Sequence, residues 1–193
     1  MKDEMLACFD AAGNSIHPHL RSKALKEPFP DYYHAVANIW VVDREGRILC
    51  SQRSKLVPAN KLKWQSKFGG HVLAGNTFLE NAIKELKEEA GLTATEADLI
   101  LVSKNVNQSH KHFSENFMLL FDHVIHEVRF IDGETAAIKW MSFEEYMQDR
   151  QSNPGKWVNN LEPEAYKKIQ KILKKGSLPS RHPSTSLWGQ AAR

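Results

Sequence analysis

The sequence predicts an α/β (α+β) fold in which helices cover a mixed β-sheet. Three observations support this prediction: apolar runs of strand length follow one another, one long segment has helical periodicity, and the composition is that of a globular protein. Hydrophobic residues make up 41% and charged residues 25% of the 193 residues, which argues against a disordered or fibrous chain. A chain of this length favours one domain with one core.

The first two clear strands form a predicted hairpin. His34 to Val42 and Arg47 to Gln52 are apolar runs, and the turn sequence Asp43-Arg44-Glu45-Gly46 separates them. Later runs are rich in β-branched, aromatic or other apolar residues, which favour strands. Further strands are therefore expected at Trp64 to Val72, Leu99 to Val106, Asn116 to Val128 and Ala136 to Met141.

One helix is marked at both ends. Thr77 and Glu80 can form a capping box, and Gly91 offers the left-handed residue that often follows a helix, so this helix should end at Ala90. Two further helices are indicated by the signals at their ends. The capping box of Ser142 with Glu145 starts a short helix, and Pro163 and Gly176 mark the start and the end of a last helix. We expect all these helices to cover the sheet.

The chain is predicted to form a single domain over residues 1–175. Residues 1–32 precede the hairpin and are expected to pack on the domain as an N-terminal extension. After residue 175 the composition changes, with Pro179, Pro183 and several serines. This composition favours a flexible C-terminal tail over residues 176–193.

Charge and the N-terminal sequence bear on location and partners. Asp3 and Glu4 stand where a signal peptide needs basic and apolar residues, and no apolar run reaches membrane-spanning length. We therefore expect a cytoplasmic protein without a membrane partner. The formal charge of +3 does not indicate a nucleic-acid partner, and a homodimer is compatible with the sequence. Cys8 and Cys50 lack metal-ligand spacing and are expected to be buried thiols.

The helix that ends at Ala90 carries two different faces. Its apolar residues recur at helical spacing and should pack on the sheet. Its acidic residues stand at i, i+3 and i+4 outside that stripe, so their carboxylates gather within about one turn, roughly 5 Å of rise. The apolar face comprises Leu79, Ala82, Ile83, Leu86 and Ala90, and the acidic face comprises Glu85, Glu88 and Glu89.

Taken alone, the acidic face is typical of a solvated helix surface, because Lys84 and Lys87 lie close enough to offset its charge. The preceding Gly69-Gly70 sequence favours a binding site instead. Glycines let the backbone approach a ligand closely, and clustered carboxylates suit a magnesium ion that also contacts phosphate.

The order of these residues resembles the Nudix hydrolase signature. Gly70, five residues, Asn76, seven residues, and then Lys84-Glu85-Leu86-Lys87-Glu88-Glu89-Ala90-Gly91-Leu92 match it over 23 residues. Asn76 stands where the family has Glu, and Lys84 stands where it has Arg. The resemblance implies an α/β/α sandwich and hydrolysis of a phosphoanhydride bond in a nucleoside diphosphate derivative or a similar small diphosphate. It also implies that the catalytic residues Glu85, Glu88 and Glu89 bind Mg²⁺ or Mn²⁺.

A second resemblance is to the branch of Nudix proteins related to isopentenyl diphosphate isomerase. His34 and His71 fall where the isomerase has metal-binding histidines, so a second metal site is one hypothesis. Gly69 stands at the position of the isomerase's catalytic cysteine, so the sequence favours a hydrolase over an isomerase. A Nudix-fold binding module with weak catalysis is the other alternative, because of Asn76 and Lys84.

Several contacts to the substrate follow from the resemblance, while the substrate's identity stays open. Arg53 and Lys67 are expected to contact the phosphates of the substrate. Gly69 and Gly70 are expected to let the protein backbone approach the substrate closely. The general base comes either from the signature glutamates or from a later loop. Glu115 and Glu134 are the candidates for the base in a later loop. His110 and His112 are candidates for contacts with a phosphate or a nucleobase. Trp64, Phe113 and Trp157 are candidates for stacking on a nucleobase.

Overall fold

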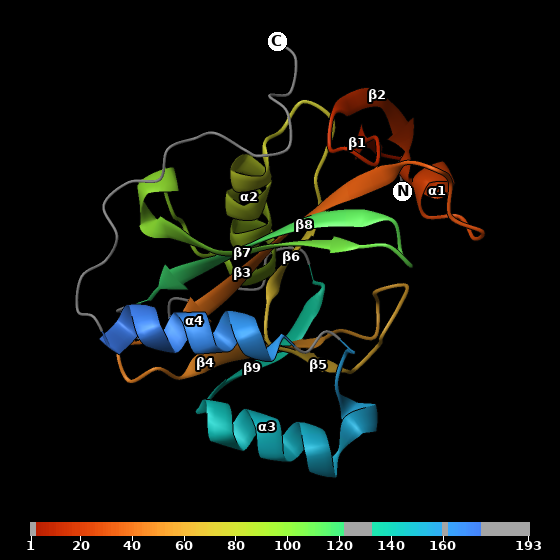
Figure 1. The fold of residues 1–193 in the computed structure, drawn as a ribbon. Helices are drawn as coiled ribbons and strands as arrows, with labels where there is room; N and C mark the ends of the chain where they lie inside the picture. Colours follow the sequence, from red (N-terminus) through yellow and green to blue (C-terminus); the bar gives the residue numbers. More distant parts are fainter. Residues whose placement is uncertain (1–2, 122–132, 160–161, 175–193) are drawn as a thin grey trace.

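The computed structural model describes residues 3–121, 133–159 and 162–174 (Figure 1). Within these ranges nine strands form one mixed sheet, covered by helices, which confirms the predicted fold class. The strands are β1 (Met5–Phe9), β2 (Ser15–Leu20), β3 (Tyr33–Val42), β4 (Ile48–Arg53), β5 (Trp64–Gln65), β6 (Phe68–His71), β7 (Leu99–Asn107), β8 (His112–Leu120) and β9 (Thr135–Met141). The α-helices are α1 (Arg21–Ala24), α2 (Phe78–Ala90), α3 (Phe143–Ser152) and α4 (Pro163–Lys174), and Glu96–Asp98 and Pro154–Lys156 form 3₁₀ turns.

Strand β3 is the centre of the sheet. It runs parallel to β8, from the pair His34 and His112 to the pair Val42 and Leu120. It runs antiparallel to β6, to β1 and, through the predicted hairpin turn, to β4. β7 pairs with the outer side of β8, and β9 pairs with β4. Every strand that carries a candidate site residue therefore lies beside β3 or one strand from it.

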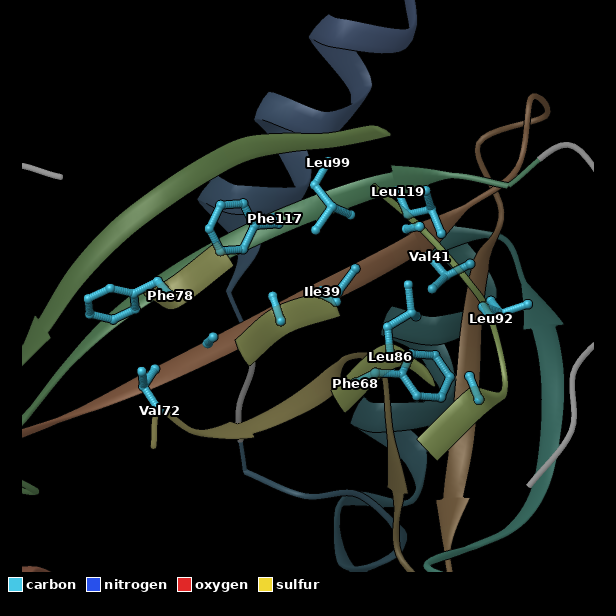
Figure 2. Close-up of a cluster of buried hydrophobic side chains, with 14 of the residues drawn as sticks. Ile39, Val41, Phe68, Val72, Phe78, Leu86, Leu92, Leu99, Phe117 and Leu119 are labelled. Carbon is cyan, nitrogen blue, oxygen red and sulfur yellow. The ribbon is translucent and has the colours of Figure 1, made fainter. Parts of the chain in front are cut away.

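Alternate side chains of β3 point into two separate cores. Ala37, Ile39 and Val41 belong to the core under α2, whose packed side chains are shown in Figure 2. Trp40 and its neighbours on the other face pack against α4, for example against Ile169. A strand that is buried on both faces reads as a continuous apolar run, as this one does. The sheet is thus the middle layer between α2 and the pair α3 and α4.

Helix α2 has the ends that the sequence predicts. Thr77 and Glu80 form the capping box in both directions, and Gly91 has the left-handed conformation, with φ of 68°. Ala82 and Leu86 are fully buried against the sheet. The three glutamates are therefore carried by a helix whose start, end and buried face are all specified locally.

Two predicted strands differ from those observed. The run Trp64 to Val72 is divided into β5, which pairs with β4, and β6, which pairs with β3, because the chain crosses between these two neighbours. The strand predicted to begin at Asn116 begins at His112, where the parallel pairing with β3 starts. Its predicted end at Val128, the residue Gly176 and the tail lie outside the described residues.

The N-terminal residues contribute β1 and β2, and β1 pairs with β3 at Cys8 and Phe9. The assignment of residues 1–175 to one domain stays a prediction. Cys8 and Cys50 are both buried and free, which confirms the expectation for the thiols. None of the helices in the described ranges has both the length and the apolar character needed to cross a membrane.

Candidate metal and phosphate site

Glu85 lies against the backbone of β6, where Gly70 leaves room for it. A Cβ atom at Gly70 would sit 2.8 Å from Oε1 of Glu85, so only glycine fits this contact without a shift. The Glu85 side chain is 18% exposed, and this burial raises its pKa to about 7; the neighbouring Lys84 opposes the shift. The result is a partly buried carboxyl group against the β6 backbone, with Lys84 and the amide of Asn81 as its nearest partners among the described residues.

Glu89 is buried, with 5% of its surface exposed, although the sequence suggested that all three glutamates lie outside the buried face. Its Oε2 accepts a hydrogen bond of 3.0 Å from the backbone N–H of Gly69. This donor explains how a carboxylate is tolerated there, because buried charge needs hydrogen-bonding partners. Glu89 therefore connects α2 to β6 directly.

Gly69 has a backbone conformation that excludes side chains. Its φ is +144°, and a Cβ atom would lie 2.1 Å from the carbonyl oxygen of Ala37 on β3. A cysteine at this position would collide with β3 unless the strands moved apart. The geometry therefore argues against the isomerase alternative, which needs a thiol here.

Glu88 is the most exposed of the three glutamates, at 45% of its side chain, and it forms an ion pair with Lys84. The distance from Lys84 Nζ to Glu88 Oε2 is 2.5 Å, between residues one helical turn apart. Among the described residues, no three Asp, Glu, His or Cys side chains are already arranged to hold a metal ion. The carboxylate chemistry and the cradle at Gly70 nevertheless fit Mg²⁺, once Glu88 leaves Lys84.

Asn76 lies far from these carboxylates. It precedes the capping residue Thr77, whereas Glu85 follows that residue by eight positions, or about 12 Å of helical rise. The replacement of an acidic residue by Asn76 therefore leaves the three-glutamate set unchanged. Lys84, the other residue that differs from the family signature, forms ion pairs with Glu85 and Glu88.

The two later candidates for the general base have different surroundings. Glu115 is buried on β8 and forms an ion pair with Lys104, at 2.6 Å. Glu134 immediately precedes β9, and its charge contributes to the raised pKa of Glu85. Its backbone also accepts a hydrogen bond from Ser54 at the end of β4. Glu134 is therefore electrostatically coupled to the site.

The predicted phosphate contacts are held by protein partners. Arg53 donates to the carbonyl of Ala59 and to the side chain of Gln65, so its guanidinium faces the loop after β4. Lys67 is buried and forms an ion pair with Glu162, just before α4. Lys67 has to exchange this partner before it can contact a phosphate.

Three histidines lie together where β3, β6 and β8 begin or end. The ring centroid of His34 is 5.0 Å from that of His71 and 5.5 Å from that of His112. Burial lowers the pKa of His34 to about 3 and that of His71 to about 4, so both are neutral at neutral pH. They are not arranged with a third donor as a metal site within the described residues.

The aromatic candidates belong to the packing of the fold. Phe113 and Trp157 are buried in the two cores. Trp64 is half-buried, and the Lys139 ammonium lies 4.4 Å from the centroid of its ring. Stacking on a nucleobase is therefore not a role for these three side chains as they stand.

A cavity of about 1010 Å³ opens between the sheet and α4, on the face opposite α2. Lys67 lines it, and so does His112, whereas His110 lies outside it on the turn before β8. The sequence analysis did not identify its polar lining. The available signal was polar residues inside otherwise apolar strands, which are Asn38 on β3, Asn116 on β8 and Ser103 on β7.

Comparisons with known proteins agree with this architecture. Residues 32–161 match the family described as NUDIX domain. An uncharacterized Nudix hydrolase of Clostridium acetobutylicum is 27% identical over 127 residues, covering 64% of this chain and 59% of that protein. An RNA pyrophosphohydrolase of Erythrobacter litoralis is 33% identical over 90 residues, covering 47% of this chain and 46% of that protein. The chain thus spans about half the length of these two relatives.

Solved structures show similarity at the level of the fold. A crystal structure of a protein from Deinococcus radiodurans has a TM-score of 0.68 at 14% identity, covering 89% of this chain and 98% of that one. The MutT protein of Methanosarcina mazei has a TM-score of 0.51 at 18% identity, covering 76% of this chain and 96% of that one.

Proposed function

The chain belongs to the NUDIX domain family, and from this premise we propose that it hydrolyses a phosphoanhydride bond with a divalent metal ion. The substrate is a nucleoside diphosphate derivative or a similar small diphosphate. The observation that carries the proposal is the partly buried Glu85 carboxyl, which lies against the backbone of Gly70 and has a raised pKa. A divalent cation there offsets the cost of burying the charge, an effect to which Lys84 and Asn81 already contribute at 3.9 Å and 3.4 Å.

The metal ligands are Glu85, Glu88 and Glu89, with Mg²⁺ as the expected ion and Mn²⁺ as a substitute. When bound, the ion polarises the diphosphate. The chain holds the ligands in different ways: Gly69 fixes Glu89 by its N–H, and Lys84 holds Glu88 until the ion replaces it. Of these two ligands, Glu89 is positioned by a contact from outside the helix, and Glu88 by a contact within it.

Glu134 is the better supported of the two later candidates for the general base. In this assignment its carboxylate takes a proton from water, the water oxygen bonds to phosphorus, and the bridging P–O bond breaks. The charge of Glu134 contributes to the raised pKa of Glu85, which supports its proximity to the three glutamates. A base next to the carboxylate set can act on a water molecule near the polarised phosphate.

Lys67 is the proposed phosphate contact, because it lies one residue before β6 and lines the cavity. Gly69 and Gly70 let the backbone of β6 approach the substrate. Arg53 has a supporting role in this proposal, since its guanidinium orders the loop after β4. The Erythrobacter relative's name, RNA pyrophosphohydrolase, is consistent with cleavage of a diphosphate linkage.

The cytoplasmic location and the homodimer stay predictions. The binding-module alternative differs from the hydrolase in one measurable respect, which is product formation. The test is release of phosphate or nucleotide from a panel of nucleoside diphosphate derivatives and dinucleotides, with Mg²⁺ and with excess EDTA. The proposal predicts product from at least one compound that disappears with EDTA. Stabilisation by these compounds without any product would instead identify a binding module.

A further inference from the structure

Asn81 is a fully buried amide on the face of α2 that packs on the sheet. It is 0% exposed and lies one helical turn before Glu85. The other buried residues of this helix before Glu85 are Phe78 and Ala82. Asparagine is a weaker helix former than alanine, and burying an amide costs free energy unless it is hydrogen-bonded. The presence of Asn81 here is therefore explained by its partners and not by the helix or the core.

The backbone that follows β6 sets the orientation of this amide. The backbone N–H of Leu73 donates to Oδ1 of Asn81 at 3.2 Å. Since a backbone N–H can only donate, the amide oxygen has to face Leu73, and the NH₂ group is left to face Glu85. Nδ2 of Asn81 lies 3.4 Å from Oε1 of Glu85. Leu73 thus makes Asn81 present a donor to the carboxyl group of Glu85.

Both side-chain partners of Glu85 approach the same one of its two carboxyl oxygens. Lys84 Nζ lies 3.9 Å from Oε1, the oxygen that the amide of Asn81 also contacts. The Lys84 side chain is 37% exposed and also pairs with Glu88, whereas Asn81 is buried and is held at its other end by Leu73. Asn81 is therefore the fixed contact of the two, and it acts on Oε1 while Oε2 is left for another ligand.

One short segment of backbone holds two of the three glutamates. Gly69 donates directly to Glu89, and Leu73 acts on Glu85 through Asn81. These two donors lie on either side of Gly70 in the chain, and the Glu85 carboxyl group lies against Gly70. The backbone from residue 69 to residue 73 therefore orders both carboxyl groups relative to one another.

We propose that Asn81 is a positioning residue of the metal site, which fixes Oε1 of Glu85 by its N–H and directs Oε2 to the divalent cation. The inference rests on the proposed function, because Glu85 is one of the metal ligands proposed above. A carboxylate that is already oriented loses less conformational freedom when it binds an ion. Partners that orient metal ligands in this way typically raise metal affinity by about ten- to a hundredfold.

The test measures Mn²⁺ affinity, from the free-ion signal in electron paramagnetic resonance, for the wild type, Asn81→Leu and Glu85→Gln. Leucine is similar in size to asparagine but neither donates nor accepts a hydrogen bond. Asn116→Leu is the matched control, because Asn116 is also a fully buried amide and its hydrogen bonds are to Asn38 and Ser103. Thermal melting checks that each variant is folded, and Asn81→Ala takes the place of Asn81→Leu if the latter is not.

We expect Asn81→Leu to weaken Mn²⁺ binding about tenfold or more, while Asn116→Leu stays within about twofold of the wild type. A second measurement separates positioning from general damage to the site. The Mg²⁺ concentration for half-maximal hydrolysis should rise by a similar factor in Asn81→Leu, whereas kcat at saturating Mg²⁺ should change by less than about threefold.

Three results would overturn the inference. The first is Mn²⁺ affinity within about twofold of the wild type in a folded Asn81 variant while Glu85→Gln binds more weakly, which would leave the proposed metal site standing. The others are equal weakening by Asn116→Leu, and a fall in kcat with an unchanged Mg²⁺ dependence. Mn²⁺ binding that depends on both Asn81 and Glu85, without hydrolysis of any compound, would overturn the proposed function and leave this inference standing.

Discussion

The backbone N–H of Gly69 donates a hydrogen bond to the buried carboxylate of Glu89, and this contact joins β6 to α2. It depends on a glycine, because the same residue approaches Ala37 on β3 more closely than any side chain allows. One residue thus sets both the distance between two strands and the position of a proposed metal ligand.

The first prediction concerns this close approach. Gly69→Ala should lower the free energy of unfolding by more than Gly75→Ala, as measured by urea denaturation. Both glycines have positive φ, at +144° and +91°, which costs about 1–3 kcal/mol for other residues. Only Gly69 adds a collision, since nothing lies within 4 Å of a Cβ at Gly75. Equal destabilisation by the two changes would contradict the account of β6.

The second prediction concerns Lys84, whose ion pair competes with metal for Glu88. Lys84→Met should tighten Mn²⁺ binding, measured by the loss of the free-ion signal in electron paramagnetic resonance. Lys87→Met is the control, because Lys87 is an exposed lysine on the same helix without a described ion pair to the three glutamates. If Lys84→Met binds Mn²⁺ no better than this control does, the competition does not exist.

The third prediction follows from the lowered pKa values of His34 and His71. The pKa values of His34 and His71, about 3 and about 4, lie below the ordinary value of 6.5, so the unfolded chain binds more protons between these values. Stability should therefore be complete above pH 6.5 and fall progressively as the pH drops towards 4. Urea midpoints across this range measure the effect.

A variant identifies the source of that pH dependence. His34→Asn should flatten it, because burial lowers the pKa of His34 further than that of His71. His17→Asn, a change at an exposed position on β2, is the comparison. An equally steep loss of stability in the His34→Asn variant would show that other groups cause it.

The local parts of the fold could be predicted from the sequence. The capping box of Thr77, the terminator Gly91 and the apolar run of β3 are signals within one segment, and the structure confirms the elements that they predict. The grouping of Glu85, Glu88 and Glu89 also follows from helical spacing alone. Their different exposures do not, because burial of Glu89 depends on β6 lying against α2.

Long-range contacts account for what was missed. Asn38, Ser103 and Asn116 form a row only because β3, β8 and β7 are neighbours, with Asn38 and Ser103 separated by more than sixty positions in the sequence. The pairing of Lys67 with Glu162 likewise requires α4 to return to β6. A sequence pattern carries no information on such pairings until the strand order is known.

The measurement that tests the central proposal most directly is kcat for the best diphosphate substrate with saturating Mg²⁺, in the wild type and in Glu85→Gln. The variant keeps the size of the side chain and removes the charge, so we predict a loss of about a hundredfold or more with an unchanged melting temperature. Glu144→Gln, at an exposed position on α3, should keep full activity. Activity of Glu85→Gln within about twofold of the wild type would contradict a metal site at Glu85.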